Sequence, residues 1–353
     1  MSGAFELHRS QFRKQADWCD RLGSPFNASL LRALAGEIGR SGPLDAFLAG
    51  GASNKAPVAS DAMALRVAGA LHGLVLSGRA PALAAAYPAQ APGWDMNAVR
   101  PRALAALEAH GSWVARFMAR PPQTNETRRA VALLPGFAAL EGPLHLLELG
   151  ASAGLNQHWD AFGYRAGQWA RQGAPGAPVI EAAWTGPAPI LPETFDVASR
   201  CGCDLSPLDV TQPSDRLALL AYIWPDQIER LERARTAIAL AQSRGVDIDK
   251  ASAADWLEEH LSGALPLGTS VIFHSIAWQY FDAATAARAA AAIYSAGTQA
   301  TDERRLAWLR FEHDSVFGAE RSAHAHTVDL ITWPGGARRC VATADPHGRF
   351  VSV

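Results

Sequence analysis

The stretch "LHLLELGASAGLN", residues 144–156, decides how the rest of the chain is interpreted. Its first six residues are mostly apolar, as in a buried strand, and they lead into a glycine-containing turn. Gly150, Ser152 and Gly154 spell G-x-S-x-G, the nucleophile elbow of serine hydrolases. Glu148, two residues before the first glycine, supports a second interpretation, in which the turn lies against a bound ligand.

A nucleophile elbow needs a particular context. In α/β-hydrolases the strand that carries the serine follows other strands and an upstream oxyanion motif. Residues 1–143 instead have the pattern of helices, and their "HG" pair, His72 with Gly73, lies inside an apolar helical stripe. Asp209, His274 and His347 are the downstream candidates for triad partners. A serine hydrolase that uses Ser152 is therefore the less favoured hypothesis.

The ligand-binding interpretation fits the segment better. A strand, a glycine turn and a helix form a crevice at the carboxyl ends of the strands of an open α/β sheet. Gly150 and Gly154 allow close approach of the backbone. The dinucleotide fingerprint G-x-G-x-x-G is not met, because Ser152 and Leu155 occupy its second and third glycine positions, and the sequence contains no G-K-[ST]. A ligand without a pyrophosphate is favoured.

The hydropathy pattern divides the chain into two parts. Residues 1–120 predict an all-helical N-terminal or cap domain, with "DAMALRVAGALHGLVL" (61–76) as a clear amphipathic helix. The segment "ARPPQTNET" (119–127) is the expected joint, because its prolines end a helix. Residues 121–353 predict the second domain.

Within residues 121–353, short apolar runs alternate with helical stretches, which predicts an α/β fold with a mostly parallel, Rossmann-like sheet. "HTVDLITW" and "RRCVATAD" flank "PGGAR" and predict an antiparallel C-terminal hairpin. Residues 160–195, rich in Gly, Pro and Trp, predict an insertion between the first two strands.

Composition limits the class of partner. The formal net charge is -2 and the sequence contains no basic block, so we expect no nucleic-acid partner. The four cysteines are too few and too scattered for a disulfide framework or a zinc site, so no metal is expected. The same charge pattern favours a small-molecule partner. No segment approaches the ~20 apolar residues of a membrane span, which predicts a cytoplasmic protein. The oligomeric state is left open.

Two further segments contain candidate ligand contacts. In "CGCDLSPLDV" (201–210), Asp204 ends a predicted strand, where a carboxylate can accept hydrogen bonds from hydroxyl groups. The alternative, in which Asp204 and Asp209 form an Asx turn and a helix cap, explains the segment equally well. In "DKASAADWLEEHL" (249–261), Ser252 is the candidate, and ordinary helix capping is again the alternative.

The segment "VIFHSIAWQYF" (271–281) has the greatest concentration of reactive side chains. His274 is a candidate general base, since its ordinary pKa lies near neutrality. Trp278, Gln279 and Tyr280 follow at the carboxyl end of a predicted central strand. The alternative is a half-buried histidine among core aromatics.

Four polar or aromatic residues near the joint and the turn complete the candidate site. Asn125 and Glu126 lie in "QTNE", where they would face the crevice or cap a helix. Asn156 and Trp159 follow the glycine turn in "GLNQHWD", where one helical face would point toward a ligand and the other toward the core.

Several segments together resemble an uncharacterised bacterial family, a domain of unknown function assigned to the methyltransferase-like Rossmann group. They are "TNETRRAVALLPGF", "LLELGASAGLN", "CDLSPLDVTQPSDRLALLAYIWPDQ", "VIFHSIAWQYF" and "ADPHGRF". Glu148, Gly150 and Gly154 are also similar to the first motif of S-adenosylmethionine-dependent methyltransferases, with Ser152 in place of its middle glycine. The resemblance implies a methyltransferase-type Rossmann domain with this cofactor.

The roles that follow from the resemblance fall into three groups. The cofactor contacts are Glu148, Gly150, Ser152, Gly154, Asp204 and Ser252. The candidate catalytic residues are His274, Tyr280 and Asn125. The candidate substrate contacts are Glu126, Asn156, Trp159, Trp278 and Gln279. A non-catalytic ligand-binding or regulatory protein with a degenerate methyltransferase fold is the alternative.

Overall fold

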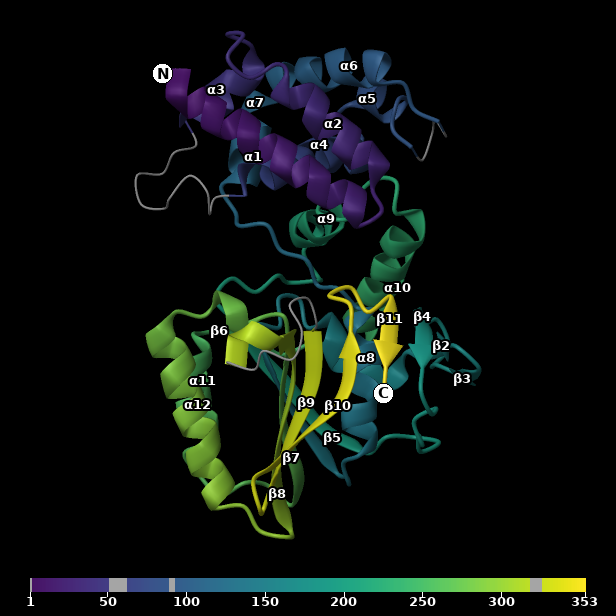
Figure 1. Ribbon diagram of the computed structural model, residues 1–353, viewed down its shortest axis with the longest axis vertical. Helices are drawn as coiled ribbons and strands as arrows, with labels where there is room; N and C mark the ends of the chain where they lie inside the picture. The colour runs from purple at the N-terminus through teal and green to yellow at the C-terminus, as the bar shows by residue number, and fades with distance from the viewer. Residues whose placement is uncertain (1, 51–61, 89–92, 318–325) are drawn as a thin grey trace. The chain divides into compact units, whose positions relative to one another are not determined.

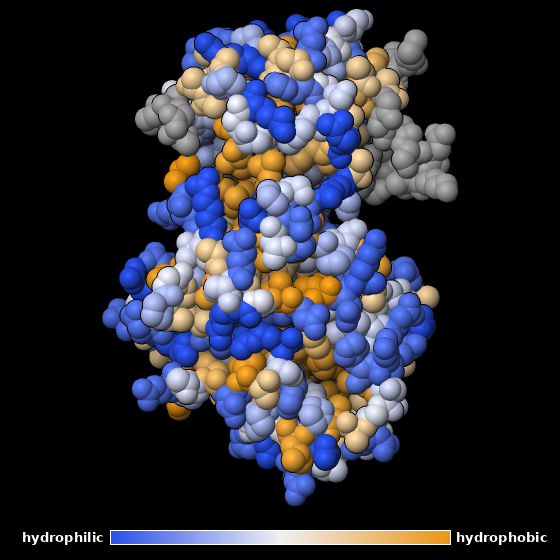
Figure 2. Space-filling model, turned by 180° about the vertical axis from the view of Figure 1, so that it is seen from behind, coloured by the Kyte–Doolittle hydropathy of each residue, from blue (hydrophilic) through white to orange (hydrophobic). Residues whose placement is uncertain are grey.

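The computed structural model describes residues 2–50, 62–88, 93–317 and 326–353. The chain forms two compact units. The first contains residues 1–124 and 211–232, and the second contains residues 125–210 and 233–353. Figure 2 shows hydrophilic and hydrophobic side chains interspersed over each unit on one face.

The first unit is helical. Its helices are α1 (Ser2–Arg21), α2 (Pro25–Ala35), α3 (Pro43–Gly50), α4 (Met63–Leu76), α5 (Pro81–Ala84), α6 (Met96–Ala109), α7 (Gly111–Met118) and α9 (Pro213–Ala221). They enclose an apolar core in which the ring centroids of Phe26 and Tyr87 lie 4.8 Å apart. The amphipathic stretch 61–76 corresponds to α4, and Asp61 lies outside the described residues.

Helix α9 belongs to the helical unit although it follows the first strands in sequence. A Cβ atom on Gly69 of α4 would lie 2.5 Å from the ring of Tyr222, so only glycine allows the close packing there. The Nδ1 atom of His72 lies 3.2 Å from the carbonyl oxygen of Ala221. The sequence pattern predicts that the helical domain contains residues 1–120 alone. Packing against α4 adds residues 211–232 to this unit.

The second unit contains an 11-stranded sheet with the order β3-β2-β4-β11-β10-β9-β8-β7-β1-β5-β6 (Figure 1). The strands are β1 (Leu144–Leu149), β2 (Gly163–Ala166), β3 (Trp169–Arg171), β4 (Val179–Thr185), β5 (Val197–Asp204), β6 (Ile248–Lys250), β7 (Gly268–Ser275), β8 (Arg304–His313), β9 (His326–Trp333), β10 (Ala337–Ala344) and β11 (Phe350–Ser352).

Five neighbouring strands, β6-β5-β1-β7-β8, are parallel, and β9 and β10 form the antiparallel hairpin that the sequence predicts. The molecule is thus a mixed α/β protein, with a helical N-terminal region and a mostly parallel sheet whose C-terminal strands are antiparallel. The segment expected as an insertion forms β2, β3 and β4, and β4 pairs with β11.

Helices cover both faces of the parallel strands. They are α8 (Arg129–Ala138), α10 (Ile228–Arg244), α11 (Ala253–His260) and α12 (Ala283–Thr298), with short 3-10 helices η2 (Leu155–Ala161), η3 (Trp278–Tyr280) and η4 (Asp314–Phe317). On one face Phe137 of α8 packs with Trp159 and Phe273. On the other, Trp256 of α11 and Ile293 of α12 belong to a separate core. Apolar side chains on both faces explain the nearly continuous apolar runs of these strands.

Candidate functional site

The chain reverses direction across the sheet at β1. Apart from the inserted strands β2, β3 and β4, the next strands β5 and β6 lie on one side of β1, whereas the later strands β7 and β8 lie on the other. In open α/β sheets ligands bind outside the carboxyl ends of the strands at such a switch point. The turn after β1, the end of β5 and the loop after β7 therefore form the candidate site.

The turn after β1 has three residues in the left-handed region. Gly150, Ser152 and Gly154 have φ values of +64°, +55° and +67°. A Cβ atom on Gly150 would lie 2.6 Å from the Cβ of Ala277, and one on Gly154 would lie 3.0 Å from Ile248. The left-handed φ favours glycine at both positions, and at Gly150 the contact with Ala277 also leaves no room for a Cβ, whether or not a ligand is bound.

Asp204 joins the end of β5 to this turn. Its Oδ2 accepts a hydrogen bond from the backbone N–H of Ser152 at 2.9 Å, and its Oδ1 accepts one from the N–H of Ser206 at 2.8 Å. The second bond is the Asx turn that was the alternative interpretation of Asp204. Because each carboxylate oxygen has two lone pairs, the half-buried Asp204 retains capacity to accept from hydroxyl groups.

Glu148 lies beneath the turn, where its residue surface is 3% exposed. Burial raises the pKa of its carboxyl group well above the ordinary value, and the negative charge of Asp204 raises it further. The folded protein therefore favours the neutral form of this carboxyl group more strongly than the unfolded chain does.

The sequence pattern did not point to Gln157, which is fully buried beside Glu148. A Cβ on Gly202 of β5 would lie 2.8 Å from the Nε2 of Gln157, so the missing side chain of Gly202 leaves room for the amide. The Oδ1 of Asn156 is buried without a hydrogen-bond partner among the described residues, and the buried amide of Gln157 lies close enough to the carboxyl group of Glu148 to lower its pKa slightly against the effect of burial. Buried polar atoms are normally paired, so the Oδ1 of Asn156 has unused capacity to bind a polar ligand or water.

The segment "QTNE" reaches the turn. The Oδ1 of Asn125 accepts a hydrogen bond from the N–H of Leu155 at 2.9 Å, at the start of η2. The Nδ2 of Asn156 donates to the carbonyl oxygen of Glu126 at 3.4 Å. Glu126 is buried, and its Oε2 lies 3.8 Å from the Nδ1 of His347. Three of the predicted residues are thus brought together beside the turn.

Trp159 is placed in the core. Its ring is fully buried and stacks on Phe137, with ring centroids 3.9 Å apart, and Phe195 packs on its edge. A substrate would reach this ring only if that packing opened. Ser252 accepts a hydrogen bond from the N–H of Asp255 at 3.2 Å and caps α11, which is the alternative role weighed for it.

His274 and Glu148 point to opposite faces of the sheet. Glu148 pairs in register with Phe273, and successive residues of a strand alternate between faces. His274 is fully buried, with its Nδ1 2.7 Å from the Oε1 of Glu312, and its Nε2 accepts from the Nε1–H of Trp308 at 3.1 Å. Since the Trp308 nitrogen only donates, the network assigns the proton of the neutral imidazole to Nδ1.

The remaining residues of "VIFHSIAWQYF" differ in exposure. Trp278 is buried, and its ring stacks on that of His274 at 5.1 Å between centroids. Gln279 is exposed, and Tyr280 is 78% exposed. Gln279 and Tyr280 are therefore the accessible members of this segment, whereas both nitrogens of His274 already have partners.

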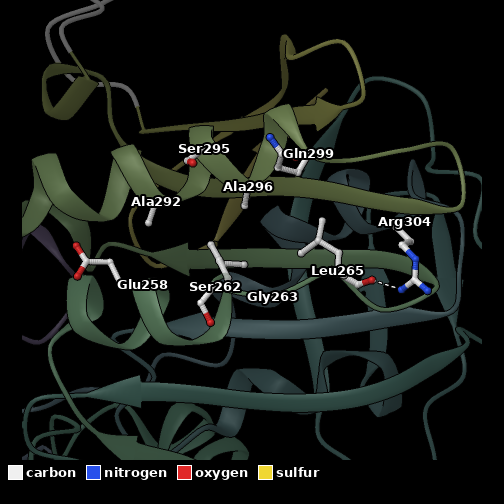
Figure 3. Close-up of a pocket in the computed structure, with 11 residues that line it drawn as sticks. Glu258, Ser262, Gly263, Leu265, Ala292, Ser295, Ala296, Gln299 and Arg304 are labelled. Carbon is white, nitrogen blue, oxygen red and sulfur yellow. Dashed lines mark hydrogen bonds between the residues drawn. The ribbon is translucent and has the colours of Figure 1, made fainter.

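A surface pocket lies elsewhere in the second unit (Figure 3). It is bordered by α11, α12 and the segments that precede β7 and β8, with Glu258, Ser262, Gln299 and Arg304 among its lining residues. Arg304 donates to the carbonyl oxygen of Leu265 at its rim. These are the amino ends of the strands, the edge opposite the candidate site, and the pocket lining includes none of the predicted site residues.

Two further features are absent from the described part of the chain. Within it, no three or more His, Cys, Asp or Glu side chains are grouped as metal ligands would be. No described helix combines the length and apolar character needed to cross a bilayer.

The fold and the site define a mixed α/β protein with a tight glycine turn at the switch point of its sheet. The chain belongs to the family described as "Uncharacterized protein conserved in bacteria (DUF2332)", whose model matches residues 9–353. This match confirms the resemblance to an uncharacterised bacterial family. Neither the curated proteins nor the solved structures include a match.

Proposed function

We propose that the protein is an S-adenosylmethionine-dependent methyltransferase that acts on a small molecule. The observation that carries the proposal is the link between Asp204 and the glycine turn, through the 2.9 Å hydrogen bond from the N–H of Ser152. This bond places a partly exposed carboxylate beside the turn that ends the central strand, at the switch point of the sheet.

The side chains present suit a nucleoside with a polar tail and no phosphate. Ribose hydroxyl groups donate hydrogen bonds, and Asp204 has lone pairs left to accept them. The buried polar side chains of Glu148, Asn156 and Gln157 would bind polar groups of the ligand. Ser152, which stands where the methyltransferase motif has glycine, contributes a mostly buried side chain to the turn.

The cofactor would supply an electrophilic methyl group bound to sulfur. The protein then has to orient the acceptor and exclude water, and these effects provide most of the rate for such a transfer. Asn125, Gln279 and Tyr280 are the residues that we assign to the acceptor, because Asn125 lies at the turn and the other two are exposed after β7.

Calorimetric titration with S-adenosylmethionine and S-adenosylhomocysteine tests the proposal. We expect the wild-type protein to bind both, and Asp204→Asn to bind at least about 10-fold more weakly, because a hydrogen bond to a charged acceptor contributes about 1.5–3 kcal/mol. Asp196→Asn is the matched control, since Asp196 is exposed immediately before the amino end of the same strand. Absence of binding at millimolar ligand contradicts the proposal.

A non-catalytic ligand-binding protein is the second candidate. It is favoured by the position of His274, whose two nitrogens are occupied by Glu312 and Trp308 and are closed to solvent. The hydrogen bonds of His274, the predicted general base, thus stabilise the fold and leave neither ring nitrogen available to a substrate. Incubation with S-adenosylmethionine and a bacterial small-molecule extract, with mass-spectrometric detection of S-adenosylhomocysteine, separates the candidates: binding without product formation supports the second.

A further inference from the structure

Glu312 organises the loop that follows β7. Its Oε1 accepts three hydrogen bonds, from the Nδ1–H of His274 at 2.7 Å and from the backbone N–H groups of Ala277 at 2.8 Å and Trp278 at 3.0 Å. Burial raises the pKa of Glu312, but the hydrogen bond and electrostatic interaction with His274 and the two backbone N–H groups outweigh it and hold the pKa below its ordinary value. One buried carboxyl oxygen thus fixes two backbone amides of the loop.

The same loop contains backbone strain. Ile276 has a φ of +53°, which is rare for a β-branched residue. Its N–H donates to the carbonyl oxygen of Phe311 at 2.8 Å, and Arg129 donates to the carbonyl oxygen of Ser275 at 2.9 Å. Strained residues persist where the surroundings fix them and are concentrated at functional sites.

The loop forms one wall of the candidate site. Ala277, whose N–H is bound by Glu312, is the residue that a Cβ on Gly150 would meet at 2.6 Å. Because Gly150 begins the turn that Asp204 holds, a movement of Ala277 changes the space in front of that turn. Gln279 and Tyr280 follow Trp278 directly, so the hydrogen bonds to Glu312 also fix the backbone position from which these exposed side chains project.

We infer that Glu312 is a positioning residue of the ligand site, which holds residues 276–278 against the glycine turn and thereby sets the affinity for the nucleoside ligand. The inference rests on the proposed function for the identity of that ligand. The inference assigns Glu312 a role that sequence patterns did not indicate. It also implies that the contact between His274 and Glu312 fixes the conformation of the loop and does not serve proton transfer.

Hydrogen exchange and ligand titration on the full-length protein test this inference with Glu312→Ala and Glu312→Gln. We expect the amides of Ala277 and Trp278 to exchange at least about 10-fold faster in Glu312→Ala, and S-adenosylhomocysteine to bind about 10-fold more weakly. Glu312→Gln should lie between the wild type and Glu312→Ala in both measurements, because its amide oxygen still accepts. If Glu312→Ala does not fold, Glu312→Gln provides both readouts.

Asp314→Asn is the matched control. Asp314 is a buried acid two residues away whose carboxylate has no hydrogen-bond partner among the described residues, so this variant should leave both measurements within about 2-fold of wild type. Unchanged exchange in folded Glu312 variants overturns the inference, and so does faster exchange with unchanged affinity. If the wild-type protein binds neither nucleoside, the proposed function fails, and the exchange rates alone decide whether Glu312 holds the loop.

Discussion

Gly150 and Ala277 lie so close that a Cβ atom on Gly150 would be 2.6 Å from the Cβ of Ala277. The contact joins the turn after β1 to the loop after β7, the two strands at the switch point of the sheet. From the sequence, Gly150 was expected to allow the close approach of a ligand. The contact with Ala277 explains the glycine by packing inside the protein instead.

Gly150→Ala should therefore lower the free energy of unfolding by about 2–4 kcal/mol, from the left-handed φ and from overpacking together. Gly176→Ala is the control, because Gly176 has a φ of +73° but no atom lies within 4 Å of the place that its Cβ would take, and it should lose only about 1 kcal/mol. Urea denaturation measures both. Adding Ala277→Gly to Gly150→Ala should recover the packing part, and no recovery would contradict the close contact as the cause.

Replacing Glu148 with Gln should change how stability depends on pH. The raised pKa of Glu148 means that the unfolded chain releases this proton first, so wild-type stability falls as the pH rises from the unfolded pKa toward the folded one. Glu148→Gln lacks this loss and should be more stable than wild type by about 1 kcal/mol or more at pH 8, with little gain near pH 4. Denaturation across pH measures the difference, and Glu193→Gln, at an exposed position, should show none.

His274→Phe should destabilise the second unit. The change keeps an aromatic ring but leaves the Oε1 of Glu312 without its side-chain donor and the Nε1–H of Trp308 without an acceptor. Unsatisfied buried groups cost about 1–3 kcal/mol each, so we expect a loss of about 3 kcal/mol in chemical denaturation. His260→Phe is the control, because His260 is exposed and its Nδ1 contacts the carbonyl oxygen of Trp256 on the same helix. Equal losses in the two variants would show that the network adds nothing.

Ser152 should not react with a fluorophosphonate probe. Its surface is mostly buried, and the candidate histidines are committed elsewhere: His274 to Glu312 and Trp308, and His347 near Glu126. Serine nucleophiles need an adjacent base to react. In-gel fluorescence, with a known serine hydrolase as the positive control, makes the measurement. Labelling that disappears in Ser152→Ala would restore the hydrolase hypothesis.

Local pattern was sufficient for the main elements of the second unit. The apolar run before Gly150 predicted β1 and its turn. The alternation of short apolar runs with helical stretches predicted the parallel strands, and "PGGAR" predicted the hairpin of β9 and β10. Such signals depend on residues close together in sequence, where period and turn chemistry are set. The family match over residues 9–353 also follows from the sequence alone.

The pairings that build the candidate site came only from the tertiary structure. Ser152 and Asp204 are 52 residues apart, and His274 and Glu312 are 38 apart, so their contacts depend on which strands become neighbours. Glu312 carries no such local signal, because every residue of β8 from Leu306 to Glu312 is buried and no periodicity distinguishes it. Strand order also put His274 and Glu148 on opposite faces. Periodicity shows that a residue is buried, but only the order and register of strands determine which partner it meets.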